Sequence, residues 1–285
     1  MLNYREGRPR FLRRGRQSRP RFRRGVYLLP SLLTLGNMFC GYTCIVYAMH
    51  GEYETAAPYI GIAIVLDMLD GRIARMTGTT SPFGVEFDSL ADIISFGVAP
   101  AILSFSWGLS TLGRLGSAAG FLFVAAAAIR LARFNIQSSS GGDKRYFVGV
   151  PSPAAAAIPA ATVFAYPWGL YDYRQALLAL VMVLVPALFM VSTIRFRSFK
   201  TIDSQTRRPY TVLIFVAAGI MLIATHPRVV LVLMAYGYFA SGFVGLAITR
   251  FRRGSRGAAE PPLPSLPEAE HTQTEDTLPR DSAAS

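Results

Sequence analysis

Four aspartates lie between Asp67 and Asp92 in a chain of 285 residues that is 52% hydrophobic and only 16% charged. Asp67 and Asp70 are three residues apart, so on a helix their side chains lie roughly 60° apart on one face. Asp88 and Asp92 are four residues apart, which leaves about 40° between them on the following helix. Because an ionised aspartate at the centre of a membrane helix costs about 2.5–3.5 kcal/mol, four of them need a balancing charge. Divalent cations held between the two pairs are the obvious source of that charge.

Several segments approach about twenty consecutive apolar residues, the length that crosses a hydrocarbon core of about 30 Å. A segment in lipid must satisfy its own backbone hydrogen bonds, so these segments are predicted to be helices. We therefore predict an all-α fold, a polytopic membrane helix bundle with eight transmembrane helices. The predicted spans are residues 26–49, 55–76, 86–109, 112–134, 152–168, 175–194, 209–225 and 229–249.

Both ends of the chain differ from this apolar part in composition. Residues 1–25 hold ten arginines against a single acid, Glu6, and are predicted to form a disordered arm at the membrane surface. Residues 251–285 are rich in Pro, Glu and Ser without apolar periodicity, which predicts a disordered polar tail. Residues 26–250, between these two ends, are predicted to form one transmembrane domain.

The net charge of +12 is distributed unevenly across the predicted membrane topology. With eight spans, all of the 29 lysines and arginines except Arg114, Arg174 and Arg228 fall on the side of the two termini. Since basic residues mark the cytoplasmic side, both termini and the aspartate cluster are predicted to be cytoplasmic. The expected location is the cell (inner, cytoplasmic) membrane, as the bacterial resemblance given below implies. Anionic lipid headgroups explain the basic arm, which lacks a motif that enters a nucleic-acid groove, so no nucleic-acid partner is expected.

The residues between the aspartates favour a ligand that contains phosphate. Gly71 and Ala74 have almost no side chain, which leaves room for a bulky ligand against the backbone of the second helix. Arg75 completes the row that starts at Asp67 and offers a planar, permanently charged fork for phosphate oxygens. On the third helix, Gly84 stands four residues before the next aspartate. Carboxylate oxygens are hard ligands that suit Mg²⁺ or Mn²⁺, and two such ions could clamp a diphosphate.

Two features of the apolar part allow more than one interpretation. Isolated aspartates in membranes often serve as ion relays, so a cation transporter is an alternative, but it leaves the interleaved small residues and arginine unexplained. In the first span, Thr34, Asn37 and Gly41 recur at helical spacing. Such a stripe either packs against another helix or faces the aspartates, and the sequence leaves both open.

The pattern D-x2-D-G-x2-A-R-x8-G-x3-D-x3-D, which the chain matches from Asp67 to Asp92, resembles the signature of the CDP-alcohol phosphotransferase family. That resemblance implies transfer of a substituted phosphate from a cytidine diphosphate donor to an alcohol, with release of CMP. The surrounding segments are similar to the bacterial branch that uses serine, the CDP-diacylglycerol–serine O-phosphatidyltransferases (phosphatidylserine synthases). They are LPSLLTLGNMFCGY, SPFGVEFDSLADIISFGVAPA, RLARFN, FVGVPSPAAA and MVSTIRFRSFK, so the likeness covers roughly residues 26–200.

Carried over to this chain, the resemblance implies a site with two divalent cations, Mg²⁺ or Mn²⁺. Their ligands would be Asp67, Asp70, Asp88 and Asp92. Asp92 would also be the catalytic base that takes the proton from the serine hydroxyl. CDP-diacylglycerol would be held by small, polar and basic residues, namely Gly71, Ala74, Arg75, Ser81, Gly84, Thr34 and Asn37. The candidates for binding the serine carboxylate are cations at cytoplasmic helix ends, namely Arg130, Arg133 and Arg195.

The resemblance also implies a core of six helices, so two of the eight predicted spans would be additional. It implies a homodimer, with CDP-diacylglycerol and L-serine as substrates and membrane lipids as the surroundings. Another acceptor alcohol, such as glycerol phosphate, inositol or choline, is the alternative within the same chemistry.

Overall fold

The computed structural model describes residues 28–78, 81–139, 146–192, 195–197 and 209–256. The predicted basic arm lies outside the described residues. Contacts group the chain into two units, Met1–Leu246 and Ala247–Ser285. Of the second unit the structure describes only the end of a helix that runs to Arg256. The predicted tail therefore begins with helical residues, and the rest of it lies outside the described part of the chain.

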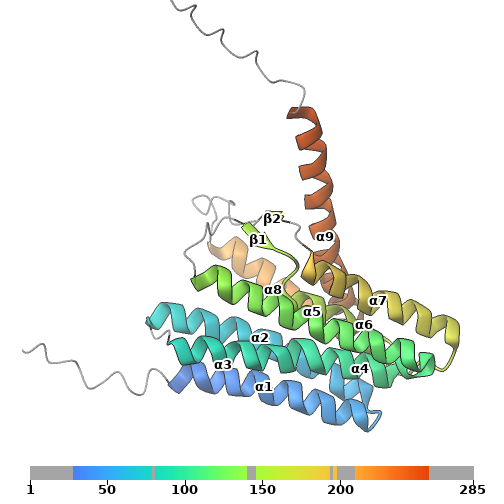
Figure 1. Cartoon of the computed structure of the whole chain (residues 1–285). Coiled ribbons are helices and arrows are strands. Elements are labelled where there is room, and N and C mark those ends of the chain that lie inside the picture. The colour runs from blue at the N-terminus through green and yellow to red at the C-terminus, as the bar shows by residue number, and fades with distance from the viewer. Residues whose placement is uncertain (1–27, 79–80, 140–145, 193–194, 198–208, 257–285) are drawn as a thin grey trace, which may run out of the picture. The chain divides into compact units, whose positions relative to one another are not determined.

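The described chain is built mainly from helices (Figure 1). In chain order, the helices are α1 (Leu28–Met49), α2 (Tyr53–Thr77), α3 (Pro82–Asp92), the π-helical segment η2 (Ile93–Val98), α4 (Ala99–Trp107), the short 3₁₀ helix η3 (Leu109–Leu112), α5 (Arg114–Ser139), α6 (Ser152–Ala165), α7 (Tyr173–Val191), α8 (Pro209–Thr225) and α9 (Pro227–Arg256). Each predicted span corresponds to one helix or, for the third span, to the continuous run α3–η2–α4. The prediction of a helical bundle is confirmed.

The described helices include four that are long and apolar enough to cross a membrane. They are Leu29–Met49, Pro82–Trp107, Arg114–Gln137 and Tyr173–Val191. α2 has a comparable length of 25 residues, but it carries the charged side chains of the aspartate motif. The chain therefore has the helices of a multi-pass membrane protein, and the number of eight spans stays a prediction.

Two strands of three residues depart from the all-α prediction. β1 (Tyr146–Val148) pairs antiparallel with β2 (Arg195–Arg197), and Phe147 lies opposite Phe196. Directly after β1, Gly149 has a φ of 85°, and a Cβ there would lie 2.6 Å from the Met190 carbonyl oxygen. The chain before α6 is therefore pressed against the end of α7, where only glycine fits.

The break between α2 and α3 has local causes. Gly78 ends α2 in the left-handed conformation, with a φ of 62°. Ser81 caps α3, because its Oγ accepts a hydrogen bond from the Gly84 N–H at 3.0 Å, and Pro82 occupies the first turn. The predicted third span begins at residue 86, whereas α3 begins at Pro82. That boundary is wrong because a proline in the first turn needs no N–H partner, so the capped helix begins there.

The helix that carries Asp88 and Asp92 continues through η2 into α4. A π-helix winds more residues into each turn than an α-helix, so the faces of the helix beyond it are rotated. Ser95 and Phe96 of η2 are fully buried, and Ser95 Oγ donates a hydrogen bond to the Asn37 carbonyl oxygen at 2.9 Å. In Figure 1, α1, the run α3–η2–α4 and α5 lie side by side, and α1 also packs against α2.

Small side chains dominate the core of the first unit. Buried alanines from α2, α5 and α6 surround larger residues such as Phe96 and Phe123. Small residues let helices approach closely, which is how membrane helices pack when lipid removes the hydrophobic drive between them. Large apolar side chains such as Phe39, Leu122 and Leu178 point outward, as expected of a surface that contacts acyl chains.

Gly41 marks a close approach between α1 and η2. A Cβ atom there would lie 2.6 Å from Ser95 Oγ and 2.8 Å from Ser95 Cα, a backbone atom. We expect Gly41→Ala to push the two helices apart and to lower the free energy of unfolding by about 1–3 kcal/mol, the usual cost of overpacking. Thermal unfolding of the purified protein in detergent would show this as a fall in Tm.

Gly61→Ala is the matched control for this substitution. Gly61 lies inside α2, and nothing lies within 4 Å of the position of an added Cβ. Alanine is favoured over glycine in a helix by about 1 kcal/mol, so this variant should keep or raise the Tm. Equal Tm values for Gly41→Ala and the wild type would contradict the close packing of α1 on η2.

Candidate metal centre and substrate site

Carboxylates from α2 and α3 meet in one cluster. One oxygen atom each of Asp67, Asp70 and Asp88 lies within 4.8 Å of the other two. Asp70 is buried, with 3% of its surface exposed, and the other two side chains are half-buried. Three ionised carboxylates at this separation repel one another unless a cation lies between them. The structure therefore brings together three of the four aspartates that the sequence predicted to be metal ligands.

The aspartate cluster fits a hard divalent cation. Its donor atoms are carboxylate oxygens, which Mg²⁺ and Mn²⁺ prefer over thiolates. In addition, Asp88 Oδ1 is buried and has no hydrogen-bond partner among the described residues. Buried carboxylate oxygens are rarely left without a partner, and a bound cation would supply one. The cluster could therefore hold a metal ion.

Asp92 lies one turn beyond Asp88 and borders the cluster. It is 7% exposed, and its Oδ1 accepts a hydrogen bond from Nδ2 of Asn37 on α1 at 3.2 Å. Its carboxylate also interacts electrostatically with Asp67, with Asp88 and with the guanidinium of Arg130. Asp92 is outside the group whose oxygens all lie within 4.8 Å of one another. The fourth aspartate is thus held beside the other three by a neutral amide.

The stripe of Thr34, Asn37 and Gly41 on α1 both faces the aspartates and packs against another helix, the two roles that the sequence left open. Thr34 Oγ1 lies 3.0 Å from Asp70 Oδ2 and 3.0 Å from the Pro30 carbonyl oxygen, so its hydroxyl donates to one of these two atoms. Asn37 also contacts an aspartate, whereas Gly41 packs against η2. The first two residues of the stripe face the carboxylates, and the third is a helix-packing residue.

The residues predicted to hold the diphosphate lie around the end of α2 and the start of α3. Arg75 is exposed, and its Nη1 lies 3.4 Å from the position that a Cβ of Gly71 would take. Ala74 is half-buried on the same helix. Ser81 and Gly84 are joined by the cap hydrogen bond of α3. This region therefore presents the permanent cation of Arg75 beside helix backbone at Gly71 and Ala74 that lacks bulky side chains.

Arg130 of α5 is a predicted serine-binding arginine that interacts electrostatically with the aspartates. Its guanidinium interacts with Asp92 and with Asp67. Its Nη1 donates a hydrogen bond to Oγ of Ser152 on α6 at 2.9 Å, and the guanidinium carbon lies 5.9 Å from the centre of the Phe134 ring. The charge is therefore fixed between α6 and the aspartates.

The other two predicted serine-binding arginines have different surroundings. Arg133 Nη1 donates to the Val191 carbonyl oxygen at 3.1 Å, so it caps the last turn of α7. Arg195 lies in β2 opposite Val148, and only its backbone is among the described atoms. Of the described side chains, that of Arg130 interacts with the aspartates and that of Arg133 bonds the end of α7.

Three serines near the site were not predicted from the sequence to have a role. Ser152 is fully buried and accepts the hydrogen bond of Arg130. Ser89 Oγ accepts a hydrogen bond from Nδ2 of Asn135 at 2.9 Å, which ties α3 to α5. Ser95 ties η2 to α1. Each of these serines stands within a predicted apolar span, where an alanine would fit equally well. A serine at such a position indicates a hydrogen bond to another helix.

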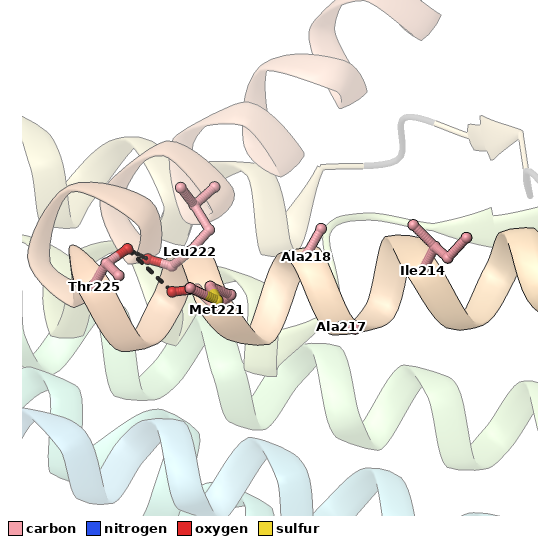
Figure 2. Close-up of a pocket in the computed structure, with 6 residues that line it drawn as sticks. All are labelled: Ile214, Ala217, Ala218, Met221, Leu222 and Thr225. Carbon is pink, nitrogen blue, oxygen red and sulfur yellow. Dashed lines mark hydrogen bonds between the residues drawn. The ribbon is translucent and has the colours of Figure 1, made fainter.

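A shallow apolar hollow on α8 lies outside this site. Figure 2 shows its lining, which comes from this one helix: Ile214, Ala217, Ala218, Met221, Leu222 and Thr225. The Thr225 hydroxyl lies 3.0 Å from the Met221 carbonyl oxygen and 3.2 Å from that of Leu222, so it is hydrogen-bonded within its own helix. The lining residues that the structure describes are apolar except for Thr225, and none of them is charged.

Carboxylates that can hold a metal, close to an exposed guanidinium, are typical of enzymes that transfer phosphate esters. The chain belongs to the CDP-alcohol phosphatidyltransferase family, whose model matches residues 27–187. The matched residues run from α1 into α7 and include all four aspartates.

Curated relatives align with about half to two thirds of this chain. The chain is 40% identical to the CDP-diacylglycerol–serine O-phosphatidyltransferase of Helicobacter pylori over an alignment of 193 residues. That alignment covers 67% of this chain and 81% of the relative. The chain is 43% identical over 145 residues to the protein of that name from Mycobacterium leprae, 49% of this chain and 48% of the relative. An archaetidylserine synthase of Methanothermobacter thermautotrophicus is 38% identical over 170 residues, 59% of this chain and 69% of the relative. All three names contain serine.

Proposed function

We propose that this protein transfers the phosphatidyl group of CDP-diacylglycerol to the hydroxyl of L-serine, giving phosphatidylserine and CMP. The observation that carries the proposal is the cluster of Asp67, Asp70 and Asp88, in a chain of the CDP-alcohol phosphatidyltransferase family. The names of the curated relatives support serine as the acceptor alcohol.

The reaction is a displacement at the β-phosphorus of CDP-diacylglycerol. A bond forms between the serine hydroxyl oxygen and that phosphorus, while the bond from phosphorus to the CMP oxygen breaks and CMP leaves with the electron pair. The hydroxyl proton passes to the carboxylate of Asp92. Asp92 suits this role because it is buried beside the cluster and its orientation is fixed by the hydrogen bond from Asn37.

The proposed ligands of two divalent cations are Asp67, Asp70, Asp88 and Asp92. Mg²⁺ or Mn²⁺ bound there would neutralise the charge of the diphosphate and of the departing CMP. α1 supports two of these ligands, since Thr34 contacts Asp70 and Asn37 contacts Asp92. Hydrogen bonds of this kind hold a ligand in place before an ion binds.

CDP-diacylglycerol is proposed to lie against the end of α2 and the start of α3. Gly71 and Ala74 leave the backbone of α2 accessible, and the exposed Arg75 offers two parallel N–H donors to phosphate oxygens. On α3, Gly84 leaves similar room, and Ser81 can donate its hydroxyl hydrogen while its oxygen caps the helix. The hydroxyl of Thr34 is the contribution proposed for α1.

Arg130 is the residue proposed to bind the serine carboxylate. Its charge lies close enough to Asp92 for the two groups to interact, so a serine bound to both would present its hydroxyl to the base. Arg133 and Arg195 are proposed to support the same region from α5 and β2. The hydrogen bond from Arg133 to the end of α7 favours a structural contribution.

The arrangement in the membrane is part of the proposal. Eight spans, with a six-helix core and two additional helices, place both termini and the aspartates on the cytoplasmic face of the inner membrane. Residues 26–250 form the transmembrane domain, and residues 1–25 and 251–285 are its polar arm and tail. Homodimer formation is proposed from the family resemblance.

The direct test is an assay of the purified full-length protein in detergent with CDP-diacylglycerol and Mg²⁺ or Mn²⁺. We expect CMP release with L-serine, with phosphatidylserine as the lipid product on thin-layer chromatography. Glycerol 3-phosphate, inositol and choline should support little or no release. Release that requires one of these alcohols instead of serine would contradict the acceptor, and metal flux into vesicles without nucleotide would favour a transporter.

A further inference from the structure

The side chain of Asn37 is fully buried, with 0% of its surface exposed, beside the proposed base. Its Nδ2 donates a hydrogen bond to Asp92 Oδ1 at 3.2 Å. Its own Oδ1 is buried and has no hydrogen-bond partner among the described residues. With Asp92 ionised, as a base must be, the amide cannot be turned round, because its oxygen would then face a carboxylate oxygen with no hydrogen between them. Asn37 therefore orients Asp92 with one atom and keeps the other as an unused acceptor.

A buried acceptor that lacks a donor is costly, and native proteins contain few of them. The other such atom in the described part of the chain is Asp88 Oδ1, which a cation in the aspartate cluster would satisfy. Asn37 Oδ1 differs, because it is a neutral amide oxygen on the side of Asp92 that faces α1. A ligand that presents an N–H or O–H group next to Asp92 would satisfy it.

Two different groups therefore flank Asp92. Asn37 on α1 offers an acceptor, and Arg130 on α5 offers a cation held by Ser152. L-Serine carries complementary groups on adjacent carbons, namely an ammonium that donates, a carboxylate that accepts, and the hydroxyl that must reach the base. Inositol and glycerol phosphate have no ammonium, and the quaternary nitrogen of choline has no N–H to donate. The pair of flanking groups thus suits a zwitterionic amino alcohol.

We propose, building on the proposed function, that Asn37 is a specificity-determining residue of the acceptor site. Its amide nitrogen orients Asp92, and its amide oxygen accepts a hydrogen bond from the ammonium group of L-serine. This assignment places Asn37 with the acceptor, whereas the family resemblance suggested CDP-diacylglycerol as its ligand.

The test compares L-serine with 3-hydroxypropionate, which keeps the hydroxyl and the carboxylate but lacks the ammonium. The KM for serine and the inhibition constant of 3-hydroxypropionate against serine are measured on the full-length protein with CDP-diacylglycerol and Mn²⁺. In Asn37→Ala, we expect the KM for serine to rise about tenfold or more, the usual effect of losing a hydrogen bond to a charged group. The inhibition constant should change less than about twofold, since that ligand never used the amide oxygen.

The ratio of these two constants separates recognition from a structural effect. If Asn37 only orients Asp92, Asn37→Ala lowers kcat for serine and leaves the ratio unchanged, and that result overturns the proposal. Thr43→Ala is the matched control, because Thr43 lies on α1 and bonds the Phe39 carbonyl oxygen of its own helix. It should keep both constants. If thermal unfolding shows that Asn37→Ala does not fold, the same ratio is measured on Asn37→Ser, whose shorter side chain cannot reach Asp92 and the ammonium together.

Failure of the proposed function gives a different result. A wild-type protein that releases CMP with another alcohol but not with serine contradicts the function before any variant is compared, and this assignment falls with it. A wild-type protein that uses serine, together with an unchanged ratio in the Asn37 variants, contradicts only the role of Asn37.

Discussion

Asp92→Asn is expected to lower the rate of CMP release by about 10²–10⁴-fold, the usual contribution of a positioned general base. Asparagine has the same shape as aspartate and can still accept the hydrogen bond from Asn37, so the fold should be retained. It cannot take up the proton of the serine hydroxyl. Steady-state release of CMP from CDP-diacylglycerol measures the rate, and thermal unfolding in detergent reports on the fold.

Glu86→Gln is the matched control for Asp92→Asn. Glu86 lies on the same helix, is exposed, and undergoes the same change from carboxylate to amide. Its rate of CMP release should stay within about twofold of the wild type, as expected for a surface substitution. If Asp92→Asn keeps more than about a tenth of the wild-type rate, Asp92 cannot be the base that the displacement requires.

Asp88→Asn is expected to lower CMP release by at least about 10–100-fold at ordinary metal concentrations, since even groups that only orient a metal ligand contribute that much. Asp88 is one of three carboxylates whose oxygens lie within 4.8 Å of one another, and its Oδ1 has no other partner among the described residues. Removing one charged ligand weakens a site for a hard cation, so the dependence of the rate on Mn²⁺ should shift to higher concentrations. A titration with Mn²⁺ measures that shift.

A second readout makes the expectation for Asp88→Asn specific to metal binding. With a chelator present, the three carboxylates repel one another, so the variant should unfold at a Tm equal to or above that of the wild type. With Mn²⁺ present, the wild type should gain stability from the bound ion and the variant should gain less. A wild-type Tm that does not respond to Mn²⁺, in a fully active protein, would contradict the assignment of this cluster as the metal site.

The aspartates are the part of the site that the sequence predicts best. Spacings of three and four residues determine which side chains share a helix face, so Asp67 and Asp70 could be paired without any tertiary information. The meeting of these two aspartates with Asp88 depends on tertiary structure, because α2 and α3 each pack on α1. The long apolar segments likewise predicted the helices, because in lipid few other structures satisfy the backbone.

Contacts between distant segments could not be predicted in this way. The pairing of β1 with β2 joins segments separated by two helices, and three residues are too few to show a strand pattern. The roles of Ser152 and Asn135 depend on the positions of α5 and α6, which helical periodicity does not fix. For Thr34 and Asn37, the periodicity identified the face of α1 but not the element that this face contacts.

The π-helical segment η2 starts directly after Asp92 and ends where α4 begins. In an uninterrupted α-helix, the angle between successive residues is fixed along the whole length. The direction of the carboxylates would then determine which face of α4 packs into the bundle. The wider winding of η2 offsets the face that carries Asp88 and Asp92 from the face on which α4 packs. The acidic side chains can therefore meet those of α2 while α4 buries Leu103 and Trp107 in the core.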